Sequence, residues 1–151
     1  MSDALRRALI DEFERALVEF AEFAREIPAD VYDAPVPGEE GSVRKILGHV
    51  VRAGYNHVRD VAQHCGGVVP ERRFEDPDHL GDPETYVAAV LDVSRFTREA
   101  LANVRDEAIE RTTFERWGVS FTGEQMMEHA TCHPGRHIRQ LRRFFDGEFA
   151  S

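Results

Sequence analysis

The sequence of 151 residues lacks several features that would assign it at once to a functional class. It has a single lysine, Lys45, and a formal net charge of −9, so it lacks the clustered cations that bind a nucleic-acid backbone. It contains no apolar run of 18 residues and no apolar signal segment. Its two cysteines, Cys65 and Cys132, form neither a C-x-x-C pair nor a disulfide framework. We therefore expect a cytoplasmic protein that binds no nucleic acid and no membrane, with both cysteines reduced and buried.

Several motifs of common enzyme classes are also missing. We find no Gly-rich phosphate-binding loop and no G-x-S-x-G nucleophile motif. With 42% hydrophobic and 31% charged residues, the composition is that of an ordinary globular protein. A chain of this length buries a core without disulfides or a structural metal. We expect one domain over residues 1–151.

Four segments have the apolar period of amphipathic helices. Ser42 and Asp82 are predicted to cap the second and third helices, and Thr122 with Gln125 forms a capping box for the fourth. Pro- and Gly-rich loops cover 31–41 and 66–81, and 111–121 alternates weakly, as in a hairpin. The pattern predicts an all-α four-helix bundle with a long connection between helices 1 and 2 and an irregular segment before helix 4. The predicted helices cover residues 5–27, 43–64, 83–104 and 123–143.

The last predicted helix contains EHATCHPGRHIRQL, residues 128–141, with a histidine every four residues. Residues i and i+4 share one helix face, so two such imidazoles can bind one metal ion. An apolar stripe through Met126 and Leu141 includes His133 and His137, which favours this pair as ligands. His129 would then flank the site or lie on the helix surface.

Pro134 lies between the two favoured histidines, where it removes one backbone amide and crowds the preceding turn. We expect a kinked but continuous helix here. An interrupted helix would instead favour His129 and His133 as the ligand pair.

A third ligand is expected from a facing helix, because metal sites in bundles are built from side chains that project inward. His49 lies among apolar residues in KILGHVV, and a buried imidazole needs a polar partner. His57 is intermediate, while His64 and His79 are expected to be exposed. The sequence therefore predicts a metal site of three histidines, at positions 49, 133 and 137.

The last helix also carries a basic run at Arg136, Arg139, Arg142 and Arg143. Cations near a helix C-terminus stabilise the helix dipole. We interpret the run in this way.

The helix-two context LGHV and the terminal HATCHPGRHIRQL resemble the DinB/YfiT-like superfamily of metalloenzymes, and the resemblance spans the chain in helix order. It implies a bundle that binds a divalent metal ion, often zinc or nickel, through His49, His133 and His137. Ile138, Gln140 and Leu141 match the tail of the family motif, whereas Pro134 departs from it. Members include transferases that use low-molecular-weight thiols and a maleylpyruvate isomerase. Dimers are common among them, so the resemblance also implies a homodimer.

Three neutral imidazoles leave a divalent ion its full charge and open coordination positions, as in catalytic sites. Such an ion lowers the pKa of a water molecule or thiol. We expect an enzyme that activates a thiol or water for transfer to, or hydrolysis of, a small substrate. The alternatives are a non-catalytic metal-binding or stress-response interaction protein, and a binding module without metal. No catalytic residue and no organic cofactor are assigned.

Overall fold

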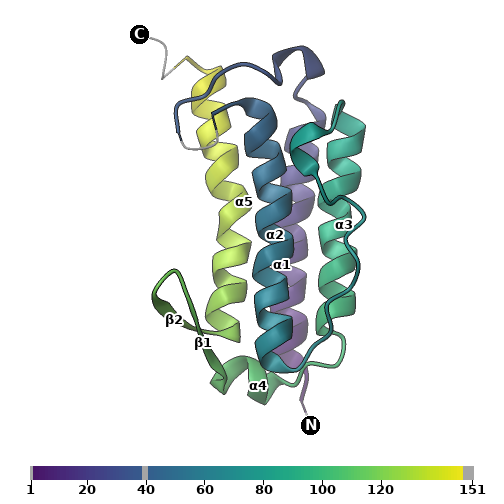
Figure 1. Ribbon diagram of the computed structural model, residues 1–151, viewed down its shortest axis with the longest axis vertical. Helices are drawn as coiled ribbons and strands as arrows, with labels where there is room; N and C mark the ends of the chain where they lie inside the picture. Colours follow the sequence, from purple (N-terminus) through teal and green to yellow (C-terminus); the bar gives the residue numbers. More distant parts are fainter. Residues whose placement is uncertain (1, 39–40, 148–151) are drawn as a thin grey trace.

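The computed structural model describes residues 2–38 and 41–147 and places four long helices side by side (Figure 1). In the sequence, a short helix and a β-hairpin come between α3 and α5, and both lie toward the end of the molecule where the N-terminus lies (Figure 1). The prediction of an all-α chain is confirmed in the coarser sense that the chain is mostly helical. The long helices are α1 (Ala4–Arg25), α2 (Val43–Cys65), α3 (Pro83–Leu101) and α5 (Gly123–Phe145); the smaller elements are α4 (Asp106–Arg111), β1 (Thr113–Arg116) and β2 (Val119–Thr122).

The two long connections are mostly irregular, as their proline and glycine content predicts. Each contains one short 3₁₀ helix, η1 (Ala29–Val31) and η2 (Pro77–His79). Residues 39 and 40 of the predicted loop 31–41 lie outside the described residues. Within the described ranges, no helix is both long and apolar enough to cross a bilayer.

Local side chains determine where three of the long helices begin. The side chains of Ser42, Asp82 and Thr122 each accept a hydrogen bond from the backbone amide three residues later. Gln125 completes the capping box, because its side chain accepts a hydrogen bond from the Thr122 amide. All three predicted caps are thus confirmed.

The beginning of α1 is capped by a residue distant in the sequence. The Asp106 carboxylate accepts hydrogen bonds from the amides of Leu5 (3.0 Å) and Arg6 (2.9 Å), which a helix leaves without partners in its first turn. Asp106 is the first residue of α4, a helix that the sequence pattern did not predict. The prediction of a third helix through Val104 was wrong, since α3 ends at Leu101 and a turn leads into α4.

The core lies between the four long helices, and α2 contributes to it along its whole length. Cys65 is buried as predicted, but Cys132 is exposed, which corrects the prediction that both are buried. Pro134 lies buried inside α5, which continues through it from Gly123 to Phe145. The prediction of a continuous helix is confirmed, and the spacing of the histidines is therefore helical.

A close approach at Gly48 brings the α2–α3 connection against α2. A Cβ atom at this position would lie 2.8 Å from the carbonyl oxygen of Pro77, so only glycine fits here. Asp78 is thereby held beside α2, where its Oδ1 lies 2.6 Å from Nη1 of Arg52. The connection thus supports the part of α2 that carries His49.

Candidate metal centre

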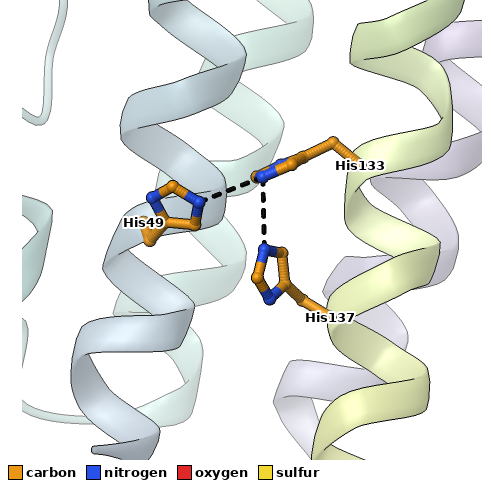
Figure 2. Close-up of side chains that lie close together, drawn as sticks. All are labelled: His49, His133 and His137. Atoms are coloured by element: carbon orange, nitrogen blue, oxygen red, sulfur yellow. Dashed lines mark hydrogen bonds between the residues drawn. The ribbon is translucent and has the colours of Figure 1, made fainter. Parts of the chain in front are cut away.

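Three histidines from two helices point their rings at one another between α2 and α5 (Figure 2). The Nε2 atom of His133 lies 3.0 Å from Nε2 of His49 and 3.2 Å from Nε2 of His137. The three possible ligand atoms all lie within 4.8 Å of one another. Imidazole nitrogens that share one tetrahedral zinc ion at 2.0–2.1 Å are separated by about 3.3 Å. The structure therefore brings the three predicted residues close enough to bind one metal ion.

Hydrogen bonds between the rings do not explain this arrangement well. The Nε2 atom of His133 carries either one proton or one lone pair, yet it has two ring nitrogens within 3.2 Å. A single proton would have to be shared between two neighbours. A cation at the point where the three nitrogens meet would accept all three lone pairs, so the residues fit a metal ion.

A glutamine fixes the orientation of one of these rings. The Nδ1–H group of His137 donates a hydrogen bond to Oε1 of Gln140 at 2.7 Å, which leaves the lone pair of Nε2 on the side of the other histidines. Gln140 is held in turn, because its Nε2 donates to the carbonyl oxygen of Pro37 in the α1–α2 connection at 3.3 Å. Partners of this kind raise the metal affinity of a histidine by fixing its tautomer.

Burial keeps the ring of His133 and that of the neighbouring His57 neutral. It lowers the pKa of His133 to about 2, an effect that the neighbouring histidines reinforce because protonated rings would repel one another. It also lowers the pKa of His57 to about 3, with smaller contributions from His129 and Arg116. A neutral imidazole is the form that binds metal, so protons compete weakly for this site.

The exposure of the remaining histidines agrees only in part with the sequence prediction. His64 and His79 are exposed, as expected. His129 is exposed and its ring centroid lies 4.8 Å from that of His57, outside the group of three, so the alternative pair of His129 and His133 is not the one that meets His49. His57 is only 4% exposed, more buried than the half-buried His49, which reverses the predicted order.

A cavity of about 340 Å³ opens beside the three histidines. It lies between α2, α5 and the turn of the β-hairpin, and its wall includes His49 and His133. Trp117 in that turn has φ = 54°, and Gly118 after it has φ = 74°. Two residues with positive φ form the tight hairpin turn that matches the twist of paired strands, and here the turn places the indole ring against His57 and His129.

The sequence interpretation missed the arginines and the tryptophan of the cavity wall. Arg52, Asn56 and His57 follow His49 at three-, seven- and eight-residue spacing on the same face of α2, which is a detectable signal. Arg136 was assigned to the helix dipole, but it lines the cavity instead. The contribution of the hairpin turn depends on tertiary packing and has no local signal. The remaining wall residues are Ala53, Arg116, Trp117, His129 and His133.

These observations define a mostly helical protein with three convergent histidines and an adjoining cavity. The family model of the DinB superfamily matches residues 12–141, a range that includes all three histidines. The chain therefore belongs to the DinB superfamily, which confirms the resemblance seen in the sequence. Neither the curated proteins nor the solved structures yield a match.

Proposed function

We propose that this chain is a metal-dependent enzyme with the four-helix bundle of the DinB type. In this proposal His49, His133 and His137 hold one divalent ion, and three imidazoles suit zinc or nickel. The observation that carries it is the convergence of three Nε2 atoms beside a cavity large enough for a small molecule. A divalent ion supplies Lewis acidity, which lowers the pKa of a thiol or a water molecule towards neutrality. The enzyme activates a low-molecular-weight thiol, or water, for transfer to or hydrolysis of a small substrate.

The protein's own residues have distinct tasks in this proposal. The long helices α2 and α5 hold the imidazoles in place, because ligands on rigid elements keep their geometry without reorganisation. Gln140 orients His137, and burial keeps His133 neutral and ready to bind. The cavity admits the substrate beside His49 and His133. Within the described residues, the group that could hold the ion consists of these three histidines.

Elemental analysis of the purified protein, combined with single variants, tests the metal site. We expect about one divalent ion per chain in the wild type. His49→Ala, His133→Ala and His137→Ala should each lower metal affinity at least about 100-fold, more than the loss of a supporting residue costs. His129→Ala serves as the matched control on the same helix and should retain the ion. A wild-type protein that binds no divalent ion after metal loading would refute the proposal.

The alternative, a non-catalytic metal protein, is favoured by one observation. Gln140 connects His137 to Pro37, so a bound ion would also tie α5 to the α1–α2 connection and stabilise the fold. Removal of the ion by a chelator separates the two proposals. A structural ion predicts a large drop in melting temperature, because metal that binds only the folded state stabilises it by mass action. A catalytic ion predicts a folded metal-free protein that loses thiol transfer to a small electrophile.

A further inference from the structure

The cavity beside the three histidines has a cationic wall. Arg52, Arg116 and Arg136 contribute to it, and among the described residues that form the wall there is no aspartate or glutamate. The chain as a whole has a net charge of −9, so this local surplus has the opposite sign to the protein. A cavity whose wall carries one sign of charge concentrates ions of the other sign.

Carboxylates outside the wall compensate two of these arginines. Asp78 lies 2.6 Å from Arg52, and Asp60 lies 3.4 Å from Arg116. Asp60 is shared with a second arginine, Arg59, at 3.5 Å, so it does not neutralise Arg116 fully. The paired carboxylates hold the two guanidinium groups in position at the cavity.

Arg136 differs from the other two. It is exposed, it lies on α5 between His133 and His137, and the part of the chain described by the structure gives it no ion pair. Burial lowers the pKa of His129 in the same wall, and repulsion by the positive charge of Arg136 lowers it further. The charge of Arg136 therefore acts on the cavity. Arg136 is therefore available to pair with an anion from solution.

A bound divalent ion would increase the positive charge further. The three imidazoles are neutral ligands, so they would compensate none of the ion's two charges. Charges in partly buried sites are costly unless an opposite charge pairs with them. An anionic molecule in the cavity would supply the missing negative charge.

We propose that the substrate of this site is a small organic anion, whose carboxylate or phosphate group is bound by Arg136 together with Arg52 and Arg116. The proposal rests on the proposed function and adds the class of substrate. The planar guanidinium group matches two oxygen atoms of a carboxylate or phosphate at once. The volume of about 340 Å³ lies near the lower end for ligand pockets, which favours a small molecule.

The single tryptophan of the chain offers a direct readout, because Trp117 lies in the cavity wall. Zinc-loaded protein is titrated with 3-mercaptopropionate and with its neutral amide, 3-mercaptopropionamide, while tryptophan fluorescence is recorded. We expect the acid to bind about tenfold more tightly than the amide, the effect of one charged hydrogen-bonded contact. Competition by acetate or by inorganic phosphate then tells which anionic group the arginines prefer.

Variants with the same change in charge identify the residue responsible. Arg136→Gln should weaken binding of the acid about tenfold and change binding of the amide less than about twofold. Arg136→Lys, which keeps the charge, should recover part of the loss. Arg139→Gln is the matched control, because Arg139 is exposed on the same helix and does not line the cavity.

Equal affinities for acid and amide, or equal losses in Arg136→Gln and Arg139→Gln, would overturn the anion proposal. The same titration on metal-free protein keeps this test separate from the metal proposal. A chain that binds no zinc but still prefers the acid would refute the metal site alone. A chain that binds zinc without any preference for the acid would refute the anion site alone.

Discussion

Two polar clusters contact α2 from different sides and differ in how completely their polar groups are paired. The aspartate cluster, formed by Tyr55, Asp92 and Arg95, lies between α2 and α3. The histidine cluster, formed by His49, His57, His133 and His137, lies between α2 and α5. Both clusters place ionisable groups between packed helices, but the first holds a charged group with hydrogen-bond partners, whereas burial keeps His57 and His133 of the second neutral.

The aspartate cluster has a donor for each oxygen of its carboxylate. Arg95 donates to Oδ1 at 2.9 Å and to Oδ2 at 2.8 Å, and the Tyr55 hydroxyl and the Arg73 amide also donate to Oδ2. Burial raises the pKa of Asp92, but these hydrogen bonds outweigh burial and lower it overall. A buried charge paired in this way holds two helices in register.

Two nitrogens of the histidine cluster, on His57 and His133, are paired less completely. The buried Nδ1 atom of His57 has no hydrogen-bond partner in the described part of the chain, and two contacts compete for one nitrogen of His133. Polar groups buried without partners cost stability and are uncommon unless they serve another purpose. The pairing of Asp92 serves the fold, whereas the incomplete pairing in the histidine cluster supports our proposal that this cluster binds a ligand.

The largest expected effect on this comparison comes from Asp92→Ala. It removes the acceptor of the buried Tyr55 hydroxyl and of Arg95, so the free energy of unfolding should fall by about 3 kcal/mol in urea titrations. Asp11→Ala is the control, because Asp11 forms a surface ion pair with Arg98 and should change stability by less than about 1 kcal/mol. Zinc affinity should not change in either variant. Equal destabilisation by the two substitutions would contradict the structural role of Asp92.

A smaller effect is expected from Gln140→Ala, which leaves the Nδ1–H group of His137 without its acceptor. Metal affinity, measured by competition with a chelator, should fall about 10- to 100-fold, while the free energy of unfolding of the metal-free protein changes little. Gln140→Glu keeps an acceptor and should retain most of the affinity. Gln63→Ala, an exposed glutamine on α2, is the control. A loss below about threefold in Gln140→Ala would show that His137 needs no support.

The sequence predicted the elements whose causes are local. The caps at Ser42, Asp82 and Thr122 were identifiable because each side chain bonds to an amide three residues away. The spacing of His133 and His137 predicted a shared face because α5 continues through Pro134. These features depend on contacts within one helix.

The features that the sequence did not reveal depend on contacts between distant segments. Asp106 caps a helix that begins about a hundred residues earlier, so neither α4 nor its role follows from local pattern. His57 is buried partly because the hairpin turn places Trp117 against it. The cavity and its arginines need the same turn, since Arg116 and Trp117 complete a wall that α2 and α5 begin.

The smallest expected effect is a loss of stability in mild acid. Of the two clusters, the histidine cluster should cause it and the aspartate cluster should not. The unfolded state of His57 binds a proton near pH 6.5, whereas burial lowers the pKa of the folded state to about 3. Between these values the unfolded state binds more protons, so stability is lost as pH falls below 6.5. The pKa of Asp92 is lowered in the folded state, so the contribution of its carboxylate to stability is lost only below about pH 4.

Between pH 7 and pH 5.5, the free energy of unfolding of the metal-free wild type should therefore fall by about 1 kcal/mol more than that of His57→Gln. Urea unfolding at each pH measures this difference. His79→Gln, a substitution of an exposed histidine, controls for the loss of any one histidine. If the free energy of unfolding of His57→Gln changed with pH as it does in the wild type, the folded protein would have to bind a proton at His57. The distinction between the two clusters would then fail, because the histidine cluster would hold a charge in the folded protein, as the aspartate cluster does.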